Sequence, residues 1–348
     1  MIRKIMMVLG VMVMIGAAGC SAKEPPKADT PAASGTNEMK ETVQKKQGTD
    51  FPAGPITLVC PWKAGAGADT ICRMFESMGQ EYFGVPIVVE NQDGAAGVTA
   101  TVNYKNTAKG DGYSVLFNNG GVFSSKSLMG TSDYTIDDFR PICGIVKDVN
   151  VLVANSSLGT NSFDEFMAKY SKTGEKLTVG CATGGIPHIC MAQLFQEADI
   201  SYTQVAYNGT SEIVTALLGG HVDLICIGAS EIGAVRDSKE AVLLTVFSDT
   251  VPNVEGLENI PPISRFGYDI DTSVWRMLLV HKDTPDEVFE VLQNGFTNMI
   301  QDQRFVDFAN KNGLVIDRKT PEEVTQAVKD EIDDMIPVFQ KLKLGIYQ

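Results

Sequence analysis

The sequence lacks the motifs that define several large classes of protein. It has three histidines, and no two of its seven cysteines form a CxxC pair, so zinc binding has little support. It contains neither the GxGxxG pattern of dinucleotide-binding folds nor a P-loop ending in lysine and serine or threonine. No nucleophile, base and orienting group stand out as a set. These absences argue against nucleotide binding and against catalysis.

Positive charge is also in short supply. The 29 lysines and arginines are outnumbered by 43 aspartates and glutamates, which gives a formal net charge of −14. An acidic surface argues against nucleic acid as a partner and against electrostatic docking on anionic lipid. If the ligand is an anion, the overall field repels it, so local dipoles must bind it.

The first 19 residues differ in composition from the rest. Arg3 and Lys4 precede an apolar run from Ile5 to Ile15, and small residues then lead to Cys20. This pattern predicts an export signal over residues 1–19, too short to remain as a spanning helix. Small residues directly before a cysteine resemble the lipobox of bacterial lipoproteins. We therefore predict lipidation at Cys20 and anchoring to the outer face of the cytoplasmic membrane; the alternative is an ordinary signal peptide followed by a stray cysteine.

Residues 20–50 contain almost no large apolar side chain and are rich in Lys, Glu, Pro, Ala, Ser, Thr and Gly. Such a segment cannot bury a core, so it is predicted to be a flexible tether.

The six remaining cysteines could form disulfides, because their number is even and export is predicted. Most of them lie within apolar runs, however, where cysteine behaves as a small core residue. This favours buried free thiols at Cys60, Cys72, Cys143, Cys181, Cys190 and Cys226.

The stretch CPWKAGAGADT, from Cys60 to Thr70, joins a predicted strand (56–59) to a predicted helix (69–82). Gly65 and Gly67 lie in the turn between them. Such a turn can bring backbone N–H groups close to a ligand at the positive end of a helix. The pattern outlines an anion site; the simplest alternative is a tight strand–helix connection.

Strands and helices then alternate, which predicts a parallel sheet with its ligand at the carboxyl ends of strands. Glycine turns are expected at 93–97, at 118–121 with an exposed backbone, and at 183–185. Thr284 and Thr320 are each followed by proline and, three residues on, by glutamate, which predicts two capped packing helices. The other predicted strands cover 87–91, 113–117, 139–155, 177–181, 204–207, 223–227, 241–247 and 274–280.

From Phe51 onward the chain resembles the extracytoplasmic solute-binding proteins of tripartite tricarboxylate transporters, the TctC or Bug family. No single motif carries the resemblance. It rests on the order and spacing of several short segments over nearly the whole chain. The matching segments are Gly54–Val59, Pro61 with Ala64–Asp69, Val88–Asn91, Asp111–Tyr113, Pro187–His188, Tyr207–Gly209 and Leu217–Asp223.

The resemblance implies an α/β, two-lobed type II periplasmic-binding-protein fold with a ligand cleft between lobes and two crossing strands, near Val149 and Val274. Lobe 1 would comprise 51–148 and 273–348, and lobe 2 would comprise 149–272. The resemblance further implies a monomeric receptor, not an enzyme, that needs no cofactor or metal. It would hold a small carboxylate largely through backbone amides and water, and deliver it to the large and small integral membrane subunits of the transporter. Alternatives are an orphan receptor that signals to a membrane sensor and an exported enzyme using a cysteine or His188.

Several candidate ligand residues have a second interpretation. Lys63 could pair with a carboxylate or be a solvated surface lysine, and Trp62 could line the cleft or cover the sheet edge. For Asp69 the favoured role is the N-cap of its helix, because its charge would repel an anion. The family match favours His188 as a cleft residue. The full set of candidates is Trp62, Lys63, Gly65, Ala66, Gly67, Asp69, Asn118, Asn119, Gly120, Thr183, Gly184, His188, Tyr207, Asn208, Gly209 and Ser230.

Overall fold

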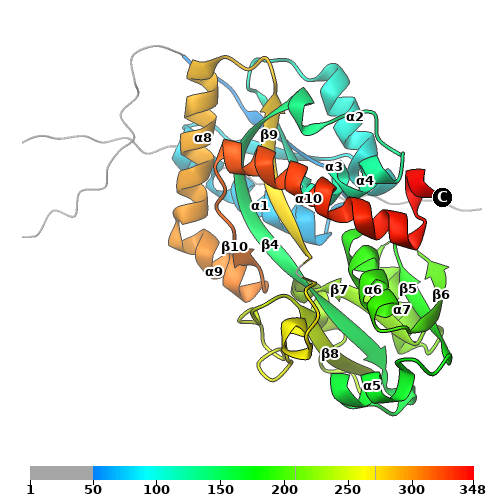
Figure 1. Cartoon of the computed structure of the whole chain (residues 1–348). Coiled ribbons are helices and arrows are strands. Elements are labelled where there is room, and N and C mark those ends of the chain that lie inside the picture. Colours follow the sequence, from blue (N-terminus) through cyan, green and yellow to red (C-terminus); the bar gives the residue numbers. More distant parts are fainter. Residues whose placement is uncertain (1–49, 208, 271) are drawn as a thin grey trace, which may run out of the picture. The chain divides into compact units, whose positions relative to one another are not determined.

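The computed structural model describes residues 50–207, 209–270 and 272–348. The predicted signal peptide, nearly all of the predicted tether, the lipidation candidate Cys20 and the ligand candidate Asn208 lie outside the described residues. In the described part, strands join in the order β2-β1-β3-β9-β4-β7-β5-β6, and β8 and β10 also pair with β4 (Figure 1).

The first half of this sheet, which we call lobe 1 with its helices, begins with three parallel strands. These are β1 (Ile56–Cys60), β2 (Ile87–Asn91) and β3 (Ser114–Asn119). Strand β9 (Ser273–His281) runs antiparallel to β3 and pairs on its other side with β4 (Phe139–Asn155). The short β10 (Val315–Ile316) also pairs with β4.

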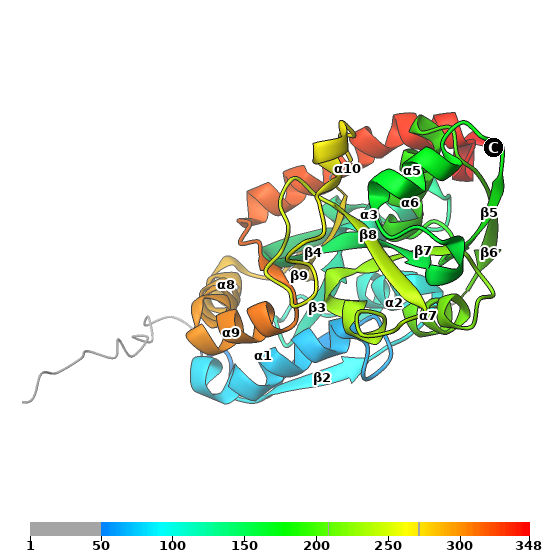
Figure 2. The same cartoon turned by 90° about the horizontal axis from the view of Figure 1, so that it is seen from below.

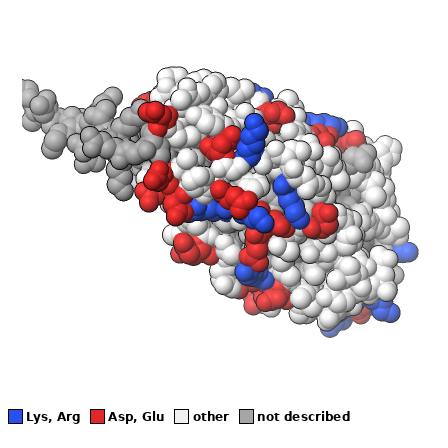
Figure 3. All heavy atoms as spheres, turned by 90° about the horizontal axis from the view of Figure 1, so that it is seen from above, with Lys and Arg blue, Asp and Glu red and all other residues white. Residues whose placement is uncertain are grey.

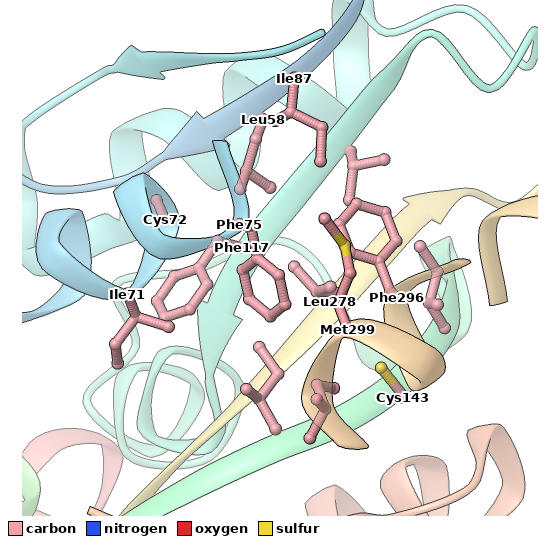
Figure 4. Close-up of a cluster of buried hydrophobic side chains, with 14 of the residues drawn as sticks. Leu58, Ile71, Cys72, Phe75, Ile87, Phe117, Cys143, Leu278, Phe296 and Met299 are labelled. Atoms are coloured by element: carbon pink, nitrogen blue, oxygen red, sulfur yellow. The ribbon is translucent and has the colours of Figure 1, made fainter. Parts of the chain in front are cut away.

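Helices cover both faces of lobe 1 because successive residues of each strand point to opposite faces. Leu58 and Phe117 pack on one face with α1, α8 and α9, in the cluster that Figure 4 shows. Val59 and Leu116 pack on the other face with α2, α3 and α10. Figure 2 shows α1 and α10 on opposite sides of the strands. The bounds are α1 Gly67–Phe83, α2 Val98–Thr107, α3 Gly120–Phe123, α4 Ser125–Leu128, α8 Asp286–Gln301, α9 Gln303–Lys311 and α10 Pro321–Leu342.

The second half of the sheet, lobe 2, repeats this plan. Strands β5, β6 and β7 are parallel, while β7 and β8 each pair antiparallel with β4. Helices α5 and α6 pack on one face and α7 on the other. The bounds are α5 Phe163–Tyr170, β5 Lys176–Cys181, α6 Ile186–Glu197, β6 Ser201–Ala206, α7 Thr210–Leu218, β7 Leu224–Gly228 and β8 Ala241–Phe247.

Strand β4 belongs to both lobes and changes partners near its middle. Asp148 and Val149 pair with the beginning of β9, whereas Asn150 pairs with Gly228, the last residue of β7. Asn119, the last residue of β3, lies beside Arg276 of the same β9. The carboxyl ends of parallel strands from both lobes therefore converge on the middle of β4. The residue boundaries given above for the two lobes stay a prediction.

Local sequence signals located most elements correctly. Thr320 is the N-cap of α10 and forms a full capping box with Glu323, as predicted. The Thr284 prediction was wrong by one residue: α8 begins at Asp286 with Pro285 at its N-cap, and the Thr284 hydroxyl donates instead to the carbonyl of His281. The six cysteines after Cys20 are buried and none of them forms a disulfide, which confirms that prediction.

Candidate functional site

The loop between β1 and α1 is organised by its own side chains. Gly65 has a φ of +84°, and its N–H donates to Asp69 Oδ2 at 2.8 Å. Helix α1 begins at Gly67 with Ala66 at its N-cap, so the prediction that Asp69 caps the helix was wrong. The carboxylate lies in the first turn and reaches backward, which satisfies one backbone donor of the loop.

Asp69 also ties this loop to the neighbouring strand. One carboxylate oxygen, Oδ1, accepts from Asn91 Nδ2 at 2.9 Å and from Arg73 Nε at 3.2 Å. Burial by itself would raise the pKa of Asp69, but the Gly65 N–H, the Asn91 amide and Arg73 outweigh it and hold the pKa below its usual value. The carboxylate of Asp69 is thus occupied by contacts with the loop, Asn91 and Arg73. The backbone N–H groups of the first turn of α1 therefore remain available to a ligand.

The loop between β5 and α6 in lobe 2 is held by the same kind of hydrogen bond. Gly184 has a φ of +70°, and its N–H donates to His188 Nδ1 at 3.1 Å, again four residues later. The His188 side chain is buried, and this burial together with the charge of Lys126 lowers its pKa to about 4. A neutral imidazole is required here, because only an unprotonated Nδ1 can accept. His188 therefore positions the loop.

The glycine turn after β2 carries an unusual backbone. All four residues from Gly94 to Gly97 have positive φ, including Ala95 at +47° and Ala96 at +53°. This conformation costs non-glycine residues free energy, and residues strained in this way are often found where a protein holds a ligand. A Cβ on Gly97 would lie 3.0 Å from Val122 and 3.2 Å from Trp62, so this turn packs closely against the β1 loop and the start of α3.

The segment after β3 differs from its prediction. Asn118 and Asn119 belong to β3, and Asn118 is fully buried with its amide donating to Thr101 Oγ1 at 2.8 Å. Asn119 is the N-cap of α3, with Oδ1 accepting from the Val122 N–H at 3.1 Å. Gly120 is buried against Trp275 and Glu331. The predicted exposed turn is wrong, because the strand continues directly into a buried helix.

Lys63 and Trp62 occupy different environments. The Lys63 side chain is 80% exposed and its Nζ lies 3.7 Å from Asp93 Oδ2. Trp62 is half-buried, packs edge-on against Phe117 and accepts a hydrogen bond at its carbonyl from Asn91. The structure thus gives Lys63 a partner within lobe 1 and makes Trp62 a wall of the β1 loop.

The remaining lobe 2 candidates also follow strand ends. Thr183 is exposed in the β5 loop, and its hydroxyl accepts from Gln204 Nε2 at 2.5 Å. Tyr207 and Gly209 join β6 to α7 and are half-buried. Ser230 follows β7, and its N–H donates to Asp148 at 3.0 Å. Together with the β1 and β5 loops, these residues place predicted candidates from both lobes at strand ends.

Three polar groups near the middle of β4, Asp148, Arg276 and Glu231, were not predicted. Asp148 is buried and lies 3.6 Å from Arg276, a contact between the crossing strand and β9. Burial and the charge of Asp148 raise the pKa of the neighbouring Glu231. Only the pairing of β4 with β9 and β7 brings these residues together, and no spacing in the sequence signals it. A fourth missed residue, Lys126, could have been noticed as a single cation among small residues after the third predicted strand.

A separate hollow of about 620 Å³ lies where α6 and β6 approach the end of α10. Its lining includes Phe195, Tyr202 and Lys341, and none of the predicted ligand residues takes part. The predicted ligand residues lie instead in loops at the helix starts and strand ends of the two lobes, the positions at which open α/β sheets commonly bind ligands.

Over residues 50–348 without 208 and 271, no group of three or more His, Cys, Asp or Glu side chains is placed to hold a metal ion. Within the same part of the chain, no helix has the length and apolar composition needed to cross a bilayer. On the face seen in Figure 3, Asp and Glu side chains stand among the Lys and Arg side chains, so this face carries no broad basic patch.

This arrangement defines a class of protein: an α/β solute-binding protein with two lobes joined through a shared strand. The chain belongs to the tripartite tricarboxylate transporter family receptors, TctC, whose sequence profile matches residues 71–344. Members of this family are solute-binding receptors and not enzymes.

Individual relatives agree with this assignment. The chain is 27% identical over 298 residues to an Agrobacterium vitis protein, "UPF0065 protein in the TAR-I ttuE-ttuC' intergenic region", covering 84% of this chain and 85% of that protein. Two Rhodopseudomonas palustris structures, each 21% identical, share the fold. One, solved with adipate, has a TM-score of 0.77 and covers 85% of this chain and 99% of its own. The other, MatC with bound malate, has a TM-score of 0.72 and covers 83% and 99%.

Proposed function

We propose that this receptor captures a small carboxylate outside the cytoplasm and delivers it to the large and small membrane subunits of a tripartite tricarboxylate transporter. One observation carries the proposal. Gly65 and Gly184 lie on opposite lobes, each shortly before a helix, and each has a left-handed backbone conformation. The N–H of each glycine donates to the side chain four residues later. Two pre-formed helix starts, one on each lobe, suit a carboxylate group that both can reach when a small molecule is bound between them.

The dipoles of these helix starts also explain how an acidic protein can bind an anion. A net charge of −14 repels an anion at long range, but the N–H groups of a helix start act over a few ångströms and need no net charge. Membership of the receptor family, together with the malate and the adipate in the two R. palustris structures, supports malate, adipate and similar acids as the ligand class. Anchoring through a lipid on Cys20 would keep the receptor near its membrane subunits.

A thermal-shift screen tests the proposal. The purified mature protein is melted with acetate, succinate, glutarate, adipate, malate, citrate, aspartate and glutamate, each against sodium chloride at equal ionic strength. At least one carboxylate should raise the melting temperature, since a ligand that binds only the folded state stabilises it. Titration calorimetry then gives the Kd. If no carboxylate in the panel stabilises the protein, the proposed ligand class is wrong.

A further inference from the structure

Lys126 lies on the helical segment that follows β3, beside the lobe 1 loops of the candidate site. Backbone hydrogen bonds continue from α3 into α4, with the Ser124 N–H on Gly120 and the Leu128 N–H on Ser124. Lys126 follows Val122 by four residues, one helical turn, so the two side chains share a side of the helix. Val122 is the residue that packs against Gly97. The segment that carries Lys126 therefore packs, through Val122, against the glycine turn after β2.

The same segment also meets lobe 2 at the start of α6. A Cβ on Gly184 would lie 2.9 Å from Met129 Cγ, and one on Gly121 would lie 2.7 Å from Ile186 Cγ1. The charge of Lys126 reaches His188, where it adds to the effect of burial in lowering the pKa of the imidazole. Lys126 thus stands between the loops of lobe 1 and the helix start of lobe 2.

The ammonium group of Lys126 has no partner in the described part of the chain. No carboxylate there forms an ion pair with it within 4.0 Å, whereas Arg276 has Asp148 and Lys63 has Asp93. Lys126 is partly buried, and burial lowers its pKa with no opposing contact. Holding an unpaired charge away from water costs stability, so folding alone gives no reason for a lysine here.

On the basis of the proposed function, we infer that Lys126 is the specificity-determining counter-ion for one carboxylate of a dicarboxylate ligand. The backbone N–H groups at the starts of α1 and α6 would hold the other carboxylate. The unpaired ammonium group supplies the local positive charge that this acidic surface lacks. A ligand with two carboxylates satisfies both the cation and a helix start, so it binds more tightly than a monocarboxylate of similar size.

Calorimetric titration of matched variants tests this inference with the tightest binder among succinate, glutarate, adipate and malate. Lys126→Met keeps the length and removes the charge, and should weaken binding about 10- to 100-fold, the loss of one charge-assisted hydrogen bond. Lys126→Arg keeps the charge and should stay within about tenfold of wild type. Lys109→Met, which removes an exposed lysine before β3 at the opposite end of that strand, should leave the Kd unchanged.

Melting of the unliganded variants separates a ligand contact from a packing role. Without ligand, Lys126→Met should melt at the same temperature as wild type or higher, because it removes an uncompensated charge. A lower melting temperature, together with weak binding that Lys126→Arg does not restore, would show a packing residue and overturn the inference. Wild-type affinity in Lys126→Met would overturn it as well while leaving the proposed function standing. If none of these acids nor any other carboxylate of the screen binds wild type, the proposed function itself fails.

Discussion

Glu331 on α10 should make the stability of this protein depend on pH. Its Oε2 accepts from Trp275 Nε1 at 2.7 Å, in the contact between α10 and the beginning of β9. Burial raises the pKa of this carboxyl from 4.5 to about 7, although hydrogen bonds from Trp275 and Ser124 and the charge of Lys319 oppose the rise. The folded state therefore binds the proton more tightly than the unfolded state does.

The direction of the pH effect follows from this difference. Below about pH 4.5 the carboxyl is protonated in both states and the contribution to stability is complete. As the pH rises to about 7, the unfolded state gains by ionising while the folded state does not, so stability falls. The shift from 4.5 to about 7 corresponds to a loss of about 3 kcal/mol.

Glu331→Gln isolates this term, because the amide is neutral at every pH and its oxygen can still accept from Trp275. Urea unfolding at several pH values should give equal free energies of unfolding for wild type and variant well below pH 4.5, where the carboxyl is protonated in both states. At about pH 8 the variant should be more stable by about 3 kcal/mol. Asp333→Asn, at an exposed carboxylate on the same helix, controls for the loss of one negative charge. A difference between Glu331→Gln and wild type that stays constant from acid to alkaline pH would refute the reasoning.

Three other predictions concern binding and location. Gly65→Val should weaken carboxylate binding by at least about tenfold, because a branched residue resists a φ of +84° even though no atom lies within 4 Å of the added Cβ. Calorimetry with Ala64→Val as the control measures this change in affinity. Equal affinities in the two variants would contradict the prediction. Cys20→Ala should move the protein from the membrane fraction to the soluble exported fraction, and unchanged sedimentation with membranes would count against lipidation. Small-angle scattering should give a smaller radius of gyration at saturating carboxylate if the lobes close around it, and an identical radius would argue against closure.

Local patterns located most of the helices and strands for a simple reason. Periodicity and turn residues act over a few positions, so strands at 87–91 and 241–247 and the capping box at Thr320 could be found from neighbours in the sequence alone. The same logic failed at Thr284, where the hydroxyl does not cap the helix and donates instead to the carbonyl of His281. It failed again at Asn118, since nothing local shows that a polar strand end will be buried.

The same distinction between local and long-range contacts applies to the candidate site. That glycine turns lead into helices at strand ends could be predicted from the sequence, because the need for a left-handed glycine and the start of an apolar helical stripe are both local properties. The structure shows what each group does there: Asp69 and His188 hold their loops through hydrogen bonds to a residue four positions away, whereas Lys63 pairs with Asp93 and Lys126 is left without a partner in the described chain. The sequence could not show the roles of Lys63 and Lys126, because contacts between residues far apart in the chain decide which charges meet and how deeply each is buried.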